Sequence, residues 1–358
     1  MNRQPFSRIT FFLTAAYAVL LLSQPQAAVS GFTQGLLLCG NRVLPALFPF
    51  FVVSALLTAL PQSRVLALPF RLITHGCGIR FPGAALILLL SWLGGYAVCA
   101  RLVGEALHAG QISRRDAGLL LAVGCCSGPG FVIGCVGGIM LGSVRLGILL
   151  YALQLAANLL AASVLCLFHP AETQKDPVPS NLSAEIVPAQ AGPDLPGAIR
   201  GAVDSCLTVC GCILFFRVTG AVIESFLPVS PLWHAIASAV LEVSAGCNDF
   251  ALLGGRAALW GCCACLSLLG FSVLAQIRQL AGPGVMDRRF FLSRVLHLCF
   301  FLGLVRLCAS ALPGEAAVYS SLGSRLIVTH RLPVDTAIIL LCFFAALLYK
   351  IGRKIYNK

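Results

Sequence analysis

Two pairs of long apolar segments in this chain are interrupted near their middle by glycine, proline and polar residues. In the first half the interruptions lie at residues 91–96 and 125–130, and in the second half at residues 241–249 and 270–276. A helix in lipid must satisfy its own backbone, so it can unwind only where the freed N–H and C=O groups line a protein cavity. Interruptions at corresponding places in two halves are typical of transporter sites near the bilayer midplane.

The composition agrees with a protein that spans the membrane several times. Of the 358 residues, 58% are hydrophobic and only 11% are charged, whereas about a quarter of a soluble domain is charged. We therefore predict an all-α polytopic membrane protein with about 8–10 transmembrane helices in two repeat-like halves. The interrupted helices either cross the bilayer or re-enter it from one side.

The net charge of +12 comes from basic residues placed singly or in small groups between the apolar runs. Cytoplasmic loops carry such an excess, so we predict a multi-pass protein of the cell (inner) membrane with both termini in the cytoplasm. No basic patch is interleaved with aromatic residues, which argues against nucleic-acid binding. The loop charges used here are Arg3, Arg8, Arg64, Arg71, Arg80, Arg114, Arg115, Arg288, Arg289, Arg294, Lys350, Arg353, Lys354 and Lys358.

The chain divides into five predicted regions. Residues 1–34 hold an apolar segment that has the shape of a signal peptide, but an uncleaved transmembrane helix is favoured because the following segments also span the membrane. Residues 35–168 and 198–296 form the two membrane halves, and residues 297–358 form C-terminal transmembrane helices and a basic tail. The proline-rich, acidic segment 169–197 reads as a disordered linker outside the cell.

A weak internal repeat supports the division into halves, although the relative orientation of the halves stays open. The matching blocks are 44–51 with 209–216, 90–95 with 241–246, and Gly128 with Gly270.

Seventeen cysteines lie mostly inside the apolar runs, where cysteine acts as a small residue that lets helices approach. Cys262 and Cys265 form a C-x-x-C without a second pair at zinc spacing. We therefore predict a packing role, no metal site and no cofactor.

Four motifs resemble those of the YlbJ-type sporulation integral membrane proteins, which carry the nucleoside-recognition (Gate) domain. Together they extend the resemblance over about residues 35–296. They are Val43-Leu44-Pro45-Ala46-Leu47-Phe48-Pro49-Phe50-Phe51, Gly95-Tyr96 through Arg101, Ser127-x-Pro129-x-Phe131-x-x-Gly134, and Leu241-Glu242 through Gly246 followed by Gly270 to Gln276.

The resemblance implies two Gate-like halves and a role in the spore envelope or cortex. Relatives with Gate domains include nucleoside transporters and the ferrous-iron permease, which implies passage of a small polar metabolite or ion. Three positions depart from the family pattern, namely Ala97, Cys99 and Gly128, so the resemblance does not carry over a particular substrate.

Glu242 is the strongest single candidate for function. A carboxylate inside an apolar span costs about 2.5–3.5 kcal/mol on insertion scales, so it usually faces a cavity or a partner. It either contacts a solute or proton, or it pairs with an arginine or caps a half-helix. Its candidate charge partners are Arg101 and Arg217. The full set of candidate substrate-binding residues is Gly94, Gly95, Tyr96, Ser127, Gly128, Glu242, Gly246, Asn248, Gly270, Ser272 and Gln276.

Two functions from different classes remain. The first is a permease-like membrane protein of spore development that moves a small polar solute or ion. The second is a non-transporting membrane scaffold that works with other sporulation proteins. No enzyme is expected, because the chain contains neither an H-E-x-x-H nor a P-loop, and Ser127 has no evident base.

Overall fold

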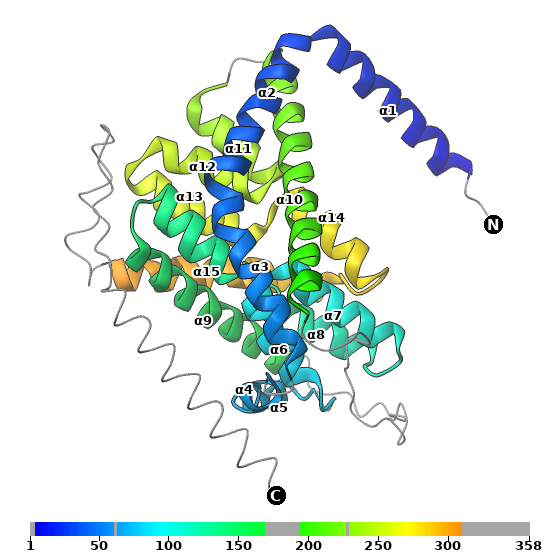
Figure 1. Ribbon diagram of the computed structural model, residues 1–358, viewed down its shortest axis with the longest axis vertical. Coiled ribbons are helices and arrows are strands. Elements are labelled where there is room, and N and C mark those ends of the chain that lie inside the picture. Colours follow the sequence, from blue (N-terminus) through cyan, green and yellow to red (C-terminus); the bar gives the residue numbers. More distant parts are fainter. Residues whose placement is uncertain (1–3, 61–62, 80, 169–193, 227–228, 310–358) are drawn as a thin grey trace, which may run out of the picture.

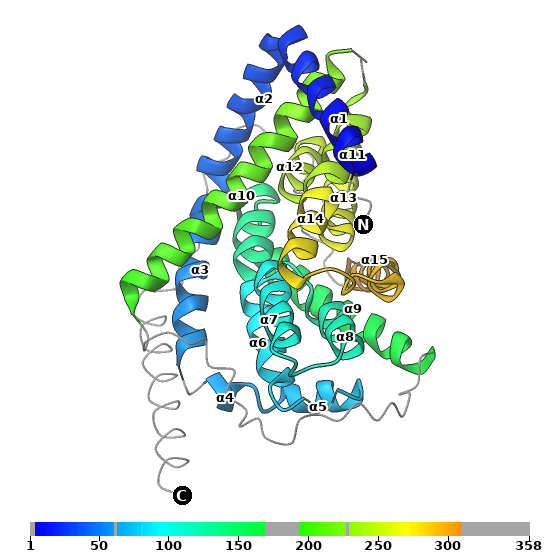
Figure 2. The ribbon, with the colours of Figure 1, turned by 90° about the vertical axis from the view of Figure 1, so that its right-hand side faces the viewer.

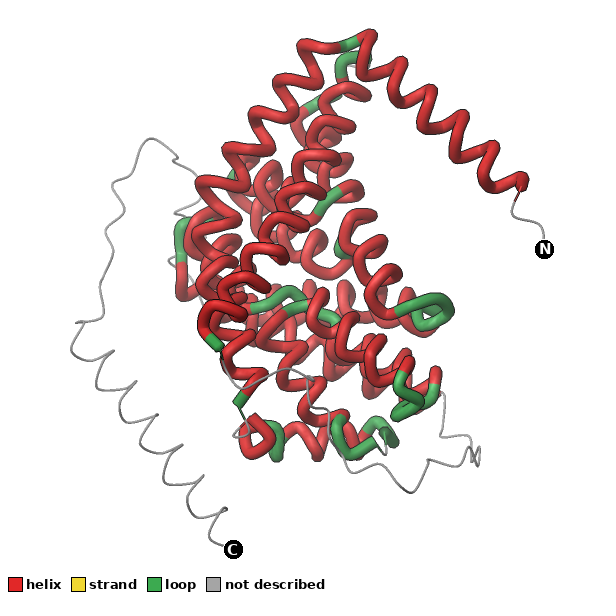
Figure 3. The backbone as a smooth tube through the Cα atoms, turned by 45° about the vertical axis from the view of Figure 1, so that its right-hand side comes forward, coloured by secondary structure: helices red, strands yellow, loops and turns green. Residues whose placement is uncertain are grey.

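A computed structural model describes residues 4–60, 63–79, 81–168, 194–226 and 229–309. Within these ranges all regular structure is helical and no strand occurs, as Figure 3 shows. The prediction of an all-α membrane protein is confirmed for the described part of the chain.

The helices of the first half follow a short N-terminal helix (Figure 1). One continuous helical rod opens this half, two broken helices follow, and a long helix closes it. The elements are α1 (Gln4–Ser23), α2 (Pro25–Leu38), the π-helical segment η1 (Cys39–Val43), α3 (Leu44–Ala59), α4 (Ser63–Leu66), α5 (Phe70–Gly76), α6 (Ala84–Gly94), α7 (Tyr96–His108), α8 (Arg114–Gly124), the π-helical segment η2 (Gly130–Met140) and α9 (Val144–Phe168).

The second half has the same order of parts: a long helix, two broken helices and a closing long helix. The elements are α10 (Leu195–Glu224), α11 (Pro231–Leu241), α12 (Val243–Leu253), α13 (Gly255–Leu268), α14 (Gly270–Ala281) and α15 (Arg288–Ala309). The blocks matched in the sequence occupy corresponding places, because each aligned pair lies in the opening rods or at the equivalent helix breaks.

The opening rods of the two halves, α2–η1–α3 and α10, lie side by side in both views (Figures 1 and 2). Their close approach depends on small residues: a methyl group on Gly31 would lie 2.8 Å from the Cβ atom of Ala221, as is common at helix contacts in membranes. The closing helices α9 and α15 also pack together. Between these pairs lies the core, which includes Leu88, Leu120 and Phe301.

Five helices of the described residues are long and apolar enough to cross a membrane. They are Pro25–Leu57, Val144–Cys166, Leu195–Glu224, Gly255–Ala281 and Arg288–Cys308. Four shorter apolar helices are Thr10–Ser23, Ala84–Gly94, Gly130–Met140 and Pro231–Leu241. The shorter helices include parts of the interrupted segments, and the predicted C-terminal region lies outside the described residues after residue 309.

Several predicted boundaries fall inside helices. The boundary after residue 34 cuts α2, and the boundary after residue 296 cuts α15, because apolar sequence continues through both points. Most of the predicted linker lies outside the described residues. Its last residues belong to α10, where Asp194 accepts a hydrogen bond from the N–H of Gly197 at 3.3 Å and caps the helix.

Candidate functional site

The two breaks of the first half touch each other through their backbones. Gly95 joins α6 to α7 at φ +82°, a left-handed conformation that glycine adopts without strain. The link from α8 to η2 runs through Ser127 and Gly128. A Cβ atom built on Gly95 would lie 3.0 Å from the N atom of Gly128, so a larger residue at Gly95 would disturb both breaks.

The two breaks of the second half meet in the same way. Glu242 is extended between α11 and α12, and Leu269 adopts φ +71° between α13 and α14. Leu269 is the only non-glycine residue with positive φ in the described chain, which costs about 1–2 kcal/mol. The next residue, Gly270, packs directly against the backbone of the α11–α12 break. A Cβ atom on Gly270 would lie 2.9 Å from the Ala239 carbonyl oxygen and 3.2 Å from the Glu242 N atom.

Three of the four breaks line one small cavity of about 40 Å³, and the fourth, at Gly270, packs against the Glu242 backbone. Gly95 and Gly128 contribute from the first half, and Val243 and Ser244 contribute from the second. Much of the remaining wall is apolar and includes Phe50. The interrupted segments therefore lie together in space, around a space that is narrow in this conformation.

Glu242 is 2% exposed and does not line this small cavity. Its Oε2 atom accepts a hydrogen bond of 2.7 Å from the N–H of Ala245 and caps α12. Glu242 also lines a cavity of about 280 Å³ together with Arg217 and His234. This carboxylate therefore caps a half-helix, which is one of the roles considered for it, and it also borders a cavity.

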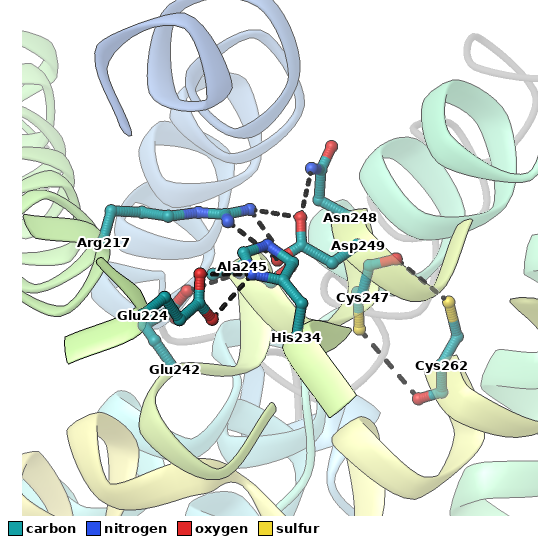
Figure 4. Close-up of polar contacts among 9 residues, drawn as sticks. All are labelled: Arg217, Glu224, His234, Glu242, Ala245, Cys247, Asn248, Asp249 and Cys262. Carbon is teal, nitrogen blue, oxygen red and sulfur yellow. Dashed lines mark hydrogen bonds and ion pairs between the residues drawn. The ribbon is translucent and has the colours of Figure 1, made fainter. Parts of the chain in front are cut away.

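Arg217, a candidate charge partner of Glu242, forms its ion pair with Asp249. Arg217 binds Asp249 with two short hydrogen bonds, Nη1–Oδ2 at 2.7 Å and Nη2–Oδ1 at 2.6 Å (Figure 4). Its Nη2 atom also donates to the Ala245 carbonyl at 3.4 Å. Arg101 is exposed on α7. Asp249 lies about two helical turns after Glu242, and the bidentate geometry favours its pair with Arg217.

His234 and Glu224 belong to the same cluster but were not among the predicted residues. The Nδ1 atom of His234 lies 2.7 and 2.6 Å from the two carboxylate oxygens of Glu224, and its Nε2 atom lies 3.1 Å from Oδ2 of Asp249 (Figure 4). Both residues fall inside predicted apolar spans. The criterion that selected Glu242, an ionisable group in such a span, would have found them.

The other predicted residues are placed as follows. Tyr96 lines the small cavity, and Gly246 packs against Ala239. Asn248 donates a hydrogen bond of 3.0 Å to Oδ1 of Asp249. Ser272 and Gln276 interact with each other along α14 at 3.3 Å, beside the second pair of breaks rather than in the ionisable cluster. Whether these residues bind a solute stays a prediction.

A second buried polar group supports the first-half break. Arg294 was assigned to a loop from its charge, which is wrong: it lies in α15 and is 3% exposed. Its guanidinium donates to the carbonyl oxygens of Cys125 at 2.7 Å and Ala122 at 2.8 Å, and to Oδ1 of Asn158 at 3.0 Å. These carbonyls end α8 and have no partner inside that helix, so the arginine stabilises the unwound link.

The Ser127 backbone is held by the same region. Its carbonyl oxygen accepts a hydrogen bond of 3.0 Å from Nε2 of Gln154. The Gln154 carbonyl in turn lies 3.2 Å from Nε2 of His297, whose Nδ1 atom lies 2.9 Å from Oγ of Ser267. This chain of contacts joins α9, α13 and α15 around the break.

Comparison with known proteins supplies one relative. The chain is 26% identical over 336 residues to the sporulation integral membrane protein YlbJ of Bacillus subtilis, an alignment that covers 81% of each chain. No protein-family model matches the chain, and no solved structure matches it. The similarity supports the YlbJ-type relationship indicated by the four motifs: over most of its length this chain is similar to a sporulation integral membrane protein.

Proposed function

We propose that this chain is a membrane protein of spore development with permease-like activity toward a small polar solute or ion. The similarity to YlbJ supports the sporulation role and the membrane location. The Gate-type assignment of the two halves is part of the proposal and rests on the motifs around Gly95, Ser127 and Glu242.

One observation carries the permease part. Three of the four broken helices line the small cavity, the fourth packs against one of these breaks at Glu242, and the Glu242 carboxylate borders a larger cavity. Broken helices that place backbone ends and a charged residue around a cavity are the usual means by which transporters bind polar solutes inside a membrane.

A scaffold function is the alternative, and a different observation favours it. The cavity that three of the breaks line holds only about 40 Å³, and Leu47, Phe50 and Phe51 form part of its wall. In a scaffold the broken helices would serve packing and the ionised form of Glu242 would be dispensable.

The substitution Glu242→Gln separates these functions. A glutamine keeps an oxygen that can accept the Ala245 N–H, so the cap at α12 and the side-chain volume are preserved while the charge is lost. We expect the variant to accumulate normally in the membrane and to cause a large loss of heat-resistant spores. The assay is complementation of a Bacillus subtilis strain that lacks YlbJ.

The matched control is Asp194→Asn, which makes the same carboxylate-to-amide change at an exposed helix cap away from the cavities. It should sporulate like the wild-type chain. Normal spore counts with Glu242→Gln at normal protein level would favour the scaffold.

The topology is part of the same proposal. Both termini lie in the cytoplasm and the segment 169–197 lies outside, because basic residues gather in the remaining loops. Removing the buried Arg294 from the loop charges leaves this asymmetry in place. Reporter fusions at the C-terminus and within the segment 169–197 should report opposite sides of the membrane, and reports from the same side would contradict the proposed orientation.

A further inference from the structure

A third cavity has a volume of about 530 Å³ and lies between the first-half rod, α10 and the broken helix α11–α12. This size falls within the range of about 300–1,000 Å³ that is usual for small-molecule sites. Its polar wall includes Gln34, Asn41, Arg42, Arg217, Asn248 and Asp249. Leu37, Leu38 and Leu252 supply apolar surface beside them.

Two of these residues come from an irregular part of the rod. Asn41 and Arg42 lie in η1, where the continuous helix from α2 to α3 widens into a π-helical turn. Such turns inside α-helices are frequent at functional sites. An arginine in an apolar membrane helix is costly, and Arg42 has no hydrogen bond or ion pair of its side chain within the described part of the chain.

The charges of the wall do not cancel. Both oxygens of Asp249 are already occupied by Arg217, His234 and Asn248. Asp249 therefore neutralises Arg217, whereas Arg42 has no acidic partner within the described ranges of the chain.

We propose that this cavity binds a small organic molecule that carries one anionic group. The anionic group lies against Arg42, the amides of Gln34, Asn41 and Asn248 contact polar groups, and the leucines contact the apolar remainder. The statement that this cavity is the substrate site for transport rests on the proposed function. The statement that it binds such a molecule does not.

The test uses the purified full-length protein in nanodiscs of phosphatidylcholine, with 4-hydroxybenzoate as the probe and 4-hydroxybenzamide as its neutral counterpart. The midpoint of thermal unfolding should rise saturably with the carboxylate and not with the amide. Arg42→Gln should weaken the apparent affinity for the carboxylate by about tenfold or more, since a charged hydrogen bond contributes about 1.5–3 kcal/mol. Arg42→Lys should retain part of the binding.

Arg42→Gln leaves no described partner without its contact, so the variant should fold. The control Arg71→Gln removes an exposed arginine on α5, away from the cavity, and should bind like the wild type. Equal stabilisation by carboxylate and amide, equal binding by wild type and Arg42→Gln, or no stabilisation by the carboxylate would overturn the proposal of a solute site.

Two further arms separate the source of the anion and the role of the site. In the first arm, phosphatidylglycerol replaces part of the nanodisc lipid. If this lipid stabilises the protein only when Arg42 is present, and the carboxylate has no effect, the anionic group belongs to a lipid headgroup and the proposal of a solute site is overturned. Glu242→Gln should still bind the carboxylate. Binding that persists while this variant sporulates normally would support the cavity and contradict the proposed permease function.

Discussion

Asp249→Ala is expected to lower the free energy of unfolding by about 3–5 kcal/mol. The substitution leaves the buried guanidinium of Arg217 without its carboxylate partner and removes the contact of Asp249 with His234. Both side chains of the pair are almost fully buried, so an unpaired charge at this position is costly. Denaturant or thermal unfolding of the purified protein in detergent measures the loss.

A double variant tests whether the cost comes from the unpaired charge. Arg217→Met combined with Asp249→Leu removes both charges and should be more stable than Asp249→Ala alone, because hydrophobic replacement of a whole buried pair is often close to neutral. The control Asp204→Ala removes an exposed carboxylate from the same helix, α10, and should change stability by less than about 0.5 kcal/mol. Equal stability of Asp249→Ala and wild type would show that the pair does not stabilise the fold.

Arg294→Met is expected to have the second large effect, a loss of several kcal/mol. The methionine cannot donate to the carbonyl oxygens of Cys125 and Ala122 or to Asn158. Each buried acceptor left without a partner costs about 1–3 kcal/mol. Hydrogen exchange should increase most at the C-terminal end of α8 and in the link to η2, where the arginine acts.

Arg294→Lys should lie between methionine and the wild type, because an ammonium group cannot reach three acceptors as a planar guanidinium does. The control Arg288→Met removes an exposed arginine from the start of α15 and should leave exchange in α8 unchanged. If exchange at the first-half break is the same in Arg294→Met as in the wild type, Arg294 does not hold the unwound link.

Much of the fold could be predicted because the composition, the apolar runs and the positions of the glycines all indicate the same helical architecture. The apolar runs require helices, and glycines such as Gly95 and Gly270 mark backbone that cannot continue a regular helix. Boundaries were predicted less well. The cuts after residues 34 and 296 fall inside α2 and α15, since a change of composition within an apolar helix carries no signal for where that helix ends.

The candidate site was predicted in part. The breaks were found from glycines and from the carboxylate of Glu242, but the pairing of Arg217 with Asp249 was not predicted, and His234 and Glu224 were not found. Both errors have the same cause. An ionisable residue in an apolar span indicates that a partner exists. Which residue is the partner depends on how α10, α11 and α12 are rotated and on the angles at which they cross.

The sequence by itself determined that this chain is a helical membrane protein in two similar halves, with four breaks and a carboxylate at one of them. Those properties follow from hydropathy and backbone freedom, which are local. Only the tertiary structure decided that Asp249 forms an ion pair with Arg217, that Glu242 caps α12 beside a cavity, and that Arg294 is buried at the end of α8. Such pairings join residues far apart in the chain, and their energies depend on distances of a few ångströms that no local pattern encodes.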